Sequence, residues 1–461
     1  MSSRTLPAYF LSLSIENIRC FGPRQTLVLT GENGMPARWT IILGENGVGK
    51  TTLLQCLARC QAVRPNERLF DSHDWWQLAA GQSAFLSASL RNDARDETGE
   101  DYFDDVDWPV TAELEADFGL GLTLESAQTA IYSPEQLATL SSSRSQFGGV
   151  HTVMTTAKDL GGSVCYGYGA TRRMGAVALS EQQENDTTAS LFSDDVTLLN
   201  AEEWLLQADY SALIDSPLQE QARLRRDQLI DVLVNLLPDV ADVRFVRPKE
   251  IGRKPGVEVQ VPYGWVSISD LSLGYRALVA WIVDFAYRMF ERYPKSETPL
   301  AEPAIVLVDE IDLHLHPKWQ RSLISYLTER FPNTQFIVTA HSPLIVQAAT
   351  DANIVLLRRE GDHVVIENDL EAIRGWRIDQ VLTSDLFGLE TARPPEYDEL
   401  LAERTKLLGK AKLTKKDEAR LKKIEAEIGD LPAGESVADI EAMDVIRRAA
   451  EVLKREGKNG R

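Results

Sequence analysis

The first 60 residues change from strand-like to helical patterning at one glycine-rich turn. L-S-L-S-I-E-N-I, from Leu11, alternates apolar and polar residues and predicts an edge strand, and T-L-V-L, from Thr26, predicts a strand that returns beside it. The apolar run W-T-I-I-L, from Trp39, predicts a buried strand that leads straight into Gly44. The segment T-T-L-L-Q-C-L-A-R, from Thr51, then predicts a helix.

Strands and helices alternate again after a long polar stretch. S-V-C-Y-G-Y-G-A predicts a core strand, residues 200–237 repeat apolar positions at helical spacing, and three short strands follow. A helix from Arg276, the strand I-V-L-V, a helix begun by Pro317 and the strand Q-F-I-V-T-A come next. I-V-L-L-R-R and H-V-V-I finish the pattern, which predicts an α/β fold.

The chain becomes helical from about Gly375. Thr414 and Asp417 have the spacing of a capping box, and Pro432 and Gly434 break the helix before a last one. Four leucines form one stripe: Leu400, Leu401, Leu407 and Leu408. Such a stripe is exposed unless something covers it, so we expect these helices to dock a partner, to pack on the rest of the chain, or to pair between copies.

Charge is unevenly distributed over the 461 residues, of which 44% are hydrophobic and 26% charged. The net charge of −20 argues against a protein that coats DNA. Residues 92–117 contain eleven acids and one base. They predict a solvated, mobile insertion or, alternatively, an acidic surface that repels nucleic acid or docks a basic partner. Residues 404–423 contain nine bases and two acids, so this helical hairpin is either a solvated face or the best candidate for binding nucleic acid.

The sequence contains no run of about 18 apolar residues and no apolar secretion signal at its start, so we expect a cytoplasmic protein that makes no contact with a membrane. Its four cysteines are Cys20, Cys56, Cys60 and Cys165. Cys56 and Cys60 lie one helical turn apart. Buried reduced thiols are favoured over a metal pair there, because no histidine or acid complements them.

The segment G-E-N-G-V-G-K-T has the pattern of a phosphate-binding loop between a strand and a helix. Its glycines let main-chain N–H groups surround phosphate oxygens, and the helix N-terminus adds positive potential. Lys50 is expected to reach the β- and γ-phosphates of ATP, and the Thr51 hydroxyl to hold Mg²⁺. The residues expected to bind ATP here are Gly44, Glu45, Asn46, Gly47, Val48, Gly49, Lys50, Thr51 and Thr52.

Asp309 and Glu310 follow the apolar strand I-V-L-V. A buried strand can hold Asp309 beside the metal, while Glu310 points to the γ-phosphate and polarises the attacking water. Two acids at a strand end can also simply cap a helix, but the company of the phosphate-binding loop favours the catalytic interpretation.

L-S-L-G, at 271–274, opens a helix ahead of the acidic strand. The Ser272 hydroxyl and the Gly274 N–H can bind the γ-phosphate held by a facing copy of the chain, aided by the helix dipole. By itself this pattern is usually only a helix cap. Its position before the acidic strand predicts an ATPase whose two heads pair face to face.

Three histidines near the acidic strand are candidates for function. His341 follows the strand F-I-V-T-A, where a neutral imidazole can hydrogen-bond the γ-phosphate and report its loss; capping of the strand is the alternative. His314 and His316 alternate in D-L-H-L-H-P. They are either metal ligands or, as we favour, part of a loop beside Asp312 that crosses the dimer interface.

Two arginine positions have open roles. Arg19 and Phe21 follow the first strand, where they either stack on an adenine or pack within the protein. Arg172 and Arg173 follow Y-G-Y-G and either serve the connection between the lobes or are solvated. The sequence does not place the glutamine that links the lobes in related ATPases.

On these motifs the chain resembles the ABC-type ATPases of the Rad50/SMC/RecF group, over roughly residues 8–60 and 160–370. D-E-I-D-L-H-L-H-P-K-W-Q-R and F-P-N-T-Q-F-I-V-T-A-H-S-P are similar to the PtuA ATPases of Septu and related retron anti-phage systems. That resemblance implies an SMC/Rad50-like head with a helical lobe, ATP and Mg²⁺ as ligands, head-to-head pairing, and a partner HNH nuclease similar to PtuB. Long coiled-coil arms are absent, and little chain follows His341 for a nuclease domain.

The resemblance divides the chain into six segments. We expect an N-terminal lobe of the head with the phosphate-binding loop at 1–60, an insertion around a few strands at 61–150, core strands at 151–180, a helical lobe with small strands at 181–270, the signature with the acidic and histidine strands at 271–374, and a helical region at 375–461.

Two functions therefore remain open at this point. One is a regulatory ATPase subunit that controls a partner HNH nuclease in anti-phage defence, with any nucleic acid bound through that partner or the basic hairpin. The other is a RecF- or Rad50-like repair ATPase that binds DNA itself.

Overall fold

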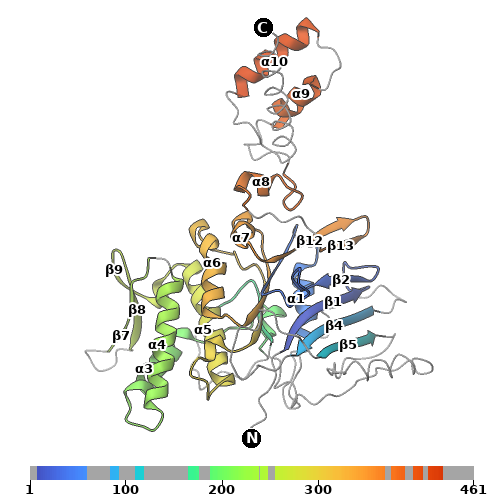
Figure 1. Cartoon of the computed structure of the whole chain (residues 1–461). Coiled ribbons are helices and arrows are strands. Elements are labelled where there is room, and N and C mark those ends of the chain that lie inside the picture. The colour runs from blue at the N-terminus through green and yellow to red at the C-terminus, as the bar shows by residue number, and fades with distance from the viewer. Residues whose placement is uncertain are drawn as a thin grey trace, which may run out of the picture. The chain divides into compact units, whose positions relative to one another are not determined.

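The computed structural model of the protein describes residues 8–59, 84–92, 110–118, 165–175, 187–237, 239–247, 255–368, 375–389, 398–408 and 414–428. Contacts divide the chain into two compact units, Met1–Glu371 and Ala372–Arg461. The first unit contains the phosphate-binding loop and the acidic strand. The predicted α/β class is confirmed there by a largely parallel sheet with helices packed against it (Figure 1).

The central sheet of the first unit has six strands in the order β13-β12-β3-β11-β10-β6. Five strands run parallel, and β13 pairs antiparallel with β12 at one edge. The strands are β3 (Trp39–Gly44), β6 (Cys165–Tyr168), β10 (Ala304–Val308), β11 (Thr334–Thr339), β12 (Asn353–Glu360) and β13 (His363–Glu367). Because parallel strands end at the same edge, the loops after β3, β6, β10 and β11 converge there.

Helices cover both faces of this sheet, which explains why its central strands are buried. All residues of β10 and β11 are buried. On one face Ile305 and Leu307 pack with Leu53 of α1 (Lys50–Arg59). On the other, the rings of Tyr168 and Trp281 lie 5.5 Å apart. That face carries α5 (Leu273–Arg292), α6 (Pro317–Arg330) and the short α7 (Pro343–Ala348).

A second, antiparallel sheet has the order β2-β1-β4-β5. Its strands are β1 (Ala8–Glu16), β2 (Gln25–Val28), β4 (Ala84–Asn92) and β5 (Val110–Phe118). The prediction that the first strand is an edge strand is therefore wrong. The alternation of apolar and polar residues along β1 shows that one of its faces is buried. It does not show that β1 also pairs with β4, which comes from the predicted insertion, far along the sequence.

The strand β5 accounts for part of the acidic segment at 92–117. Its residues from 110 onward form a strand paired with β4. Residues 93–109 of that segment lie outside the described residues.

One buried glutamine joins the two sheets. The Gln335 side chain on β11 accepts a hydrogen bond from the Phe10 N–H and donates one to the Phe10 carbonyl oxygen, both over 2.8 Å. Both main-chain polar groups of Phe10 are bonded in this way, and the oxygen and nitrogen of the buried Gln335 side chain each have a partner.

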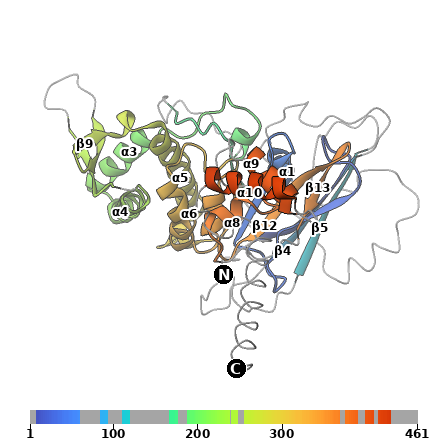
Figure 2. The ribbon, with the colours of Figure 1, turned by 90° about the horizontal axis from the view of Figure 1, so that it is seen from above.

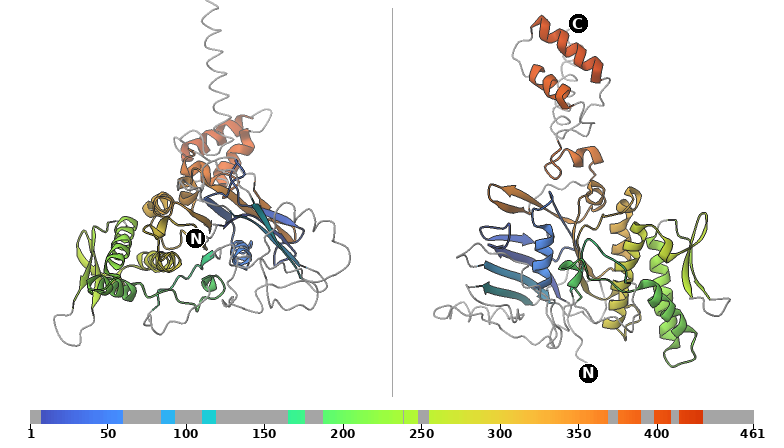
Figure 3. Two further views of the ribbon diagram at one scale, coloured as in Figure 1. Left: turned by 60° about the horizontal axis from the view of Figure 1, so that its bottom comes forward. Right: turned by 180° about the vertical axis from the view of Figure 1, so that it is seen from behind.

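A helical hairpin with a small sheet lies on the opposite side of the central sheet from β1 and β2, as the views in Figures 2 and 3 show. Its elements are α3 (Ala201–Leu213), α4 (Gln219–Leu236), β7 (Asp242–Val246), β8 (Gly256–Val261) and β9 (Gly264–Ser267). Asn200 begins α3 by accepting a hydrogen bond from the Glu203 N–H.

The second unit is helical, with α8 (Ile378–Leu382), α9 (Asp398–Leu408) and α10 (Lys415–Ile428). The predicted capping box is present, because the Thr414 and Asp417 side chains each accept the other's N–H. The leucine stripe is only partly exposed. Leu407 packs on Ile424 together with Leu400 and Leu421, whereas Leu408 is half exposed and the side chain of Leu401 lies outside the described residues. Packing within the hairpin thus covers Leu407 and part of Leu400.

None of the helices in the described ranges has both the length and the apolar character needed to cross a bilayer.

A buried carboxylate holds three segments of the first unit together. Asp284 of α5 is 2% exposed. It accepts hydrogen bonds from the Tyr168 hydroxyl over 2.9 Å, from Arg288 Nε over 2.7 Å and from the Leu199 N–H over 3.2 Å. It therefore ties β6 and the segment before α3 to α5.

Asp284→Ala should lower the free energy of unfolding by about 2–4 kcal/mol, because it leaves the mostly buried Arg288 and the Tyr168 hydroxyl unpaired. The urea midpoint measured by circular dichroism checks this value. Asp195→Ala, at an exposed position, is the control and should change the free energy of unfolding by less than about 0.5 kcal/mol. An equally small change in Asp284→Ala would contradict the assigned role.

Candidate functional site

The phosphate-binding loop leaves no room for side chains at two of its glycines. Gly44 has φ +143°, and a Cβ there would lie 2.6 Å from the Leu357 carbonyl oxygen. Gly49 has φ +91°, and its Cβ would lie 2.5 Å from Cys20 Sγ. The loop is thus packed between β12 and the turn after β1, with the exposed Glu45, Asn46 and Gly47 at its tip.

Lys50 closes this loop on itself. Its Nζ donates hydrogen bonds of 2.7 Å to the carbonyl oxygens of Gly44 and Glu45. Burial lowers the pKa of Lys50, and the carboxylates of Asp309, Glu310 and Asp312 act in the opposite direction. The ammonium group is therefore a cation close to three carboxylates.

A chain of hydrogen bonds joins the start of α1, the end of β11 and the acidic pair after β10. Thr51 Oγ1 donates to Asp309 Oδ2 over 2.7 Å, and Thr339 Oγ1 donates to Asp309 Oδ1 over 2.6 Å. The same Thr339 hydroxyl accepts from the Glu310 N–H over 2.7 Å. Both oxygens of the buried Asp309 are thereby fixed next to the phosphate-binding loop.

Glu310 has an unusual backbone conformation. Its φ of +48° lies in the left-handed region, which costs a residue with a side chain about 1–3 kcal/mol unless its surroundings impose it. The Thr339 hydroxyl binds its N–H, and Arg172 Nη2 donates to its carbonyl oxygen over 2.8 Å. Both polar groups of this residue's main chain are therefore held.

Arg172 is buried beneath the acidic pair, which resolves one open question. It is 3% exposed, and its Nη1 donates to the Asp309 carbonyl oxygen over 2.8 Å. Burial lowers the pKa of Arg172 to about 10, with Asp309, Asp312 and Glu310 opposing that shift, so the group stays charged near neutral pH. Arg173, in contrast, is exposed.

The L-S-L-G segment forms the first turn of α5. Ser272 occupies the cap position, is exposed, and makes no capping hydrogen bond with its side chain. Gly274 is buried, and a Cβ there would lie 2.3 Å from the His314 carbonyl oxygen. The turn therefore packs on the D-L-H-L-H-P segment and presents Ser272 to solvent.

The D-L-H-L-H-P segment is fixed by hydrogen bonds to its neighbours. Asp312 accepts two bonds of 3.2 Å from the N–H of His341, whose side chain is exposed. His316 begins α6 by accepting the Lys318 N–H, and His314 has φ +64°. No cluster of three or more His, Cys, Asp or Glu that could hold a metal is found in the part of the chain that the structure describes. The position of Cys60 lies outside that part.

The turn after β1 packs against α1. Arg19 Nη1 donates to Thr52 Oγ1 over 3.2 Å and to Gln55 Oε1 over 3.1 Å. Phe21 is 1% exposed and belongs to the core, so it does not stack on an adenine.

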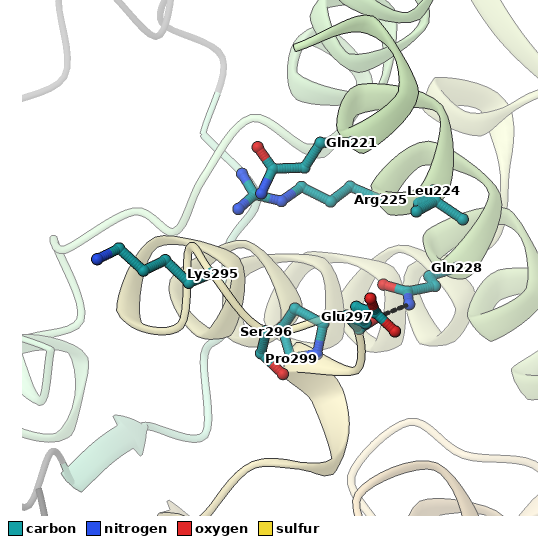
Figure 4. Close-up of a pocket in the computed structure, with 8 residues that line it drawn as sticks. All are labelled: Gln221, Leu224, Arg225, Gln228, Lys295, Ser296, Glu297 and Pro299. Atoms are coloured by element: carbon teal, nitrogen blue, oxygen red, sulfur yellow. Dashed lines mark hydrogen bonds between the residues drawn. The ribbon is translucent and has the colours of Figure 1, made fainter. Parts of the chain in front are cut away.

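A separate shallow pocket lies between α4 and the loop after α5 (Figure 4). Gln221 and Arg225 donate to the Pro294 carbonyl oxygen, and Gln228 donates to that of Glu297. These bonds attach the loop to α4, and the pocket contains none of the residues predicted to act on a nucleotide.

The structure thus brings together Lys50, Thr51, Asp309 and Glu310, and connects Asp312 with His341. Two residues that contact this group had no assigned role in the sequence. Thr339 stood in the predicted strand Q-F-I-V-T-A, where its β-branched side chain resembled ordinary packing. Arg172 was placed at a strand end, but its partner carbonyls are 137 and 138 residues away.

Comparison with known families finds two matching models. Residues 12–61 match an AAA domain family, and residues 197–347 match the family described as AAA domain, putative AbiEii toxin, Type IV TA system. The two matches contain the phosphate-binding loop and the signature with the acidic strand, respectively.

Two curated relatives are a retron ATPase and a Septu protein. The Retron Ec83 probable ATPase of Escherichia coli is 32% identical over 247 residues, which are 53% of this chain and 42% of the relative. The Septu protein PtuA of Bacillus mycoides (strain KBAB4) is 25% identical over 372 residues, which are 78% of this chain and 42% of the relative. The chain therefore matches less than half the length of either protein.

Among solved structures, an SMC head bound to the C-winged helix domain of ScpA covers 78% of this chain and 97% of that one, with 15% identity and a TM-score of 0.40. The fold assignment rests on the strand order and the motifs described above. In these motifs, in the partial family matches and in its retron and PtuA relatives, the chain is similar to ABC-type ATPases of the Rad50/SMC-like group.

Proposed function

We propose that the protein binds ATP with Mg²⁺ and hydrolyses it to ADP and phosphate. The observation that carries the proposal is the hydrogen-bond chain from Thr51 through Asp309 and Thr339 to Glu310, beside the buried Lys50. Main-chain N–H groups of residues 44–51 surround the phosphates, and Lys50 neutralises charge on the β- and γ-phosphates. Arg19 contacts the adenine of the bound ATP in this proposal.

Glu310 is the proposed general base for hydrolysis. Glu310 accepts a proton from water while the water oxygen attacks the γ-phosphorus, and the bond from that phosphorus to the β–γ bridging oxygen breaks. His341, at the end of the neighbouring strand, donates a hydrogen bond to the γ-phosphate and loses it when phosphate leaves.

Thr51 and Asp309 are the residues that would hold Mg²⁺. A hydroxyl and a carboxylate oxygen 2.7 Å apart are the hard donors that this ion prefers, and its remaining ligands are usually substrate phosphates and water. When bound, the ion neutralises charge on the β- and γ-phosphates.

The site is completed by a second copy of the chain. Ser272 and the first turn of α5 supply a hydroxyl and helix N–H groups to the γ-phosphate held by the facing protomer. The exposure of Ser272 and the absence of a capping bond from its hydroxyl support this role.

In the cell we propose a role in anti-phage defence, in which the paired heads control a partner HNH nuclease. The support is the similarity to PtuA and to retron ATPases, together with the lack of a metal cluster among the described residues. The structured part of the hairpin, 398–408 and 414–428, contains seven bases and seven acids, so direct DNA binding there has less support than residues 404–423 alone suggested.

Glu310→Gln keeps the size of the side chain but cannot accept a proton, so kcat should fall about 10²–10⁴-fold while ATP affinity stays within about threefold. Phosphate release and binding of a fluorescent ATP analogue measure the two quantities. Glu220→Gln, exposed on α4, is the matched control and should behave as wild type. Turnover of Glu310→Gln within about twofold of wild type would show that another group is the base.

The partner can be tested by purifying the chain from its native operon and measuring mass, nucleotide content and DNA cleavage. We expect an HNH protein to copurify, and cleavage to require that protein. DNA cleavage by the pure chain, with contamination excluded, would contradict the proposal. DNA binding by the chain with no copurifying nuclease would also contradict it and would favour a repair ATPase.

A further inference from the structure

We infer that Arg172 is a positioning residue for ATP hydrolysis, holding the main chain of Asp309 and Glu310 in the conformation from which the Glu310 side chain acts. This inference rests on the proposed function of Glu310. It assigns a role to the loop after β6, which the motifs of the sequence left open.

The guanidinium group binds two consecutive carbonyl oxygens. Nη1 and Nη2 each donate over 2.8 Å, the first to Asp309 and the second to Glu310. A planar guanidinium presents such donors in a fixed fork, whereas a lysine ammonium is a compact point charge. The fork therefore constrains the orientation of two successive peptide groups at once.

The main-chain conformation that these bonds hold at Glu310 is unusual. Glu310 has φ +48°, so its side chain leaves the main chain in a direction that the extended strand before it would not give. Thr339 holds the N–H of this residue, and its carbonyl oxygen accepts from Arg172 and from the Leu313 N–H. Without Arg172 that oxygen keeps only the bond from Leu313, and the link to the Asp309 carbonyl oxygen is lost, so the two peptide groups can relax to a commoner conformation.

The loop that carries Arg172 is itself fixed. A Cβ at Gly169 would lie 2.1 Å from the Ser190 carbonyl oxygen, and Ser190 Oγ accepts the Gly169 N–H. Farther on, the Leu198 N–H donates to the Arg173 carbonyl oxygen and the Gly175 N–H donates to that of Leu198. Residues on both sides of Arg172 are therefore anchored to the segment that leads into α3.

The alternative is a purely structural role, in which Arg172 only fills the space beneath β10 and stabilises the fold. A structural role and a positioning role predict different kinetics. A structural residue would change stability or ATP binding and turnover together, whereas a residue that acts through Glu310 would change kcat only while Glu310 can serve as the base.

The test uses the full chain and compares Arg172→Met with Arg173→Met, its exposed neighbour. Arg172→Met should lower kcat about 30- to 100-fold with ATP affinity within about threefold, because a small misplacement of a reacting group costs this much. Arg173→Met should match wild type. Arg172→Met combined with Glu310→Gln should hydrolyse ATP as slowly as Glu310→Gln alone, since the residue acts through Glu310.

Arg172→Lys covers the case in which the methionine variant does not fold. It keeps the charge but not the fork, so kcat should again fall at least about tenfold with ATP binding retained. A folded Arg172→Met or Arg172→Lys protein with kcat within twofold of wild type overturns the inference, as do additive losses in the double variant. If wild type does not hydrolyse ATP, or Glu310→Gln is as fast as wild type, the proposed function fails instead.

Discussion

The structure of the site depends on one constraint, which is that Asp309 must be fixed by groups from β6, β11 and the start of α1. Its main-chain N–H bonds to the Tyr168 carbonyl oxygen, and its side chain bonds to Thr51 and Thr339. These contacts are possible only because β6, β10, β11 and β3 are successive neighbours that end at one edge. The burial of both faces of the sheet makes that edge rigid.

The same constraint separates the residues of the proposed mechanism into two groups. Lys50, Thr51, Asp309 and Glu310 are held together within one chain by short hydrogen bonds. Ser272 instead faces solvent from the start of α5, although Gly274 beside it packs on the His314 carbonyl oxygen. In the proposed composite site, contact of Ser272 with a nucleotide on a second copy would therefore be transmitted to the segment that carries Asp312, whose side chain binds the His341 N–H.

Much of this arrangement could be predicted from the sequence because its signals are local. A strand, a glycine-rich loop and a helix follow one another directly around Lys50, and I-V-L-V precedes Asp309. The capping by Thr414 and Asp417 also depends on near neighbours.

Errors arose where partners are distant in sequence. Whether β1 is an edge strand depends on pairing with β4, about 70 residues later, which alternation along β1 alone does not reveal. The function of Arg172 depends on carbonyl groups more than 130 residues away, and main-chain partners leave no side-chain pattern to find. The leucine stripe was visible, but its cover on α10 was not.

The most direct test of the central claim, a site completed by a second copy, is to mix two inactive variants. Lys50→Ala and Ser272→Arg proteins should each lack ATPase activity, and an equal mixture should recover about a quarter of the wild-type rate, because half of the dimers then contain one intact site. Lys50→Ala mixed with a chain carrying both substitutions should stay inactive. Absence of recovery in the first mixture, with subunit exchange shown by copurification of differently tagged chains, would contradict the account.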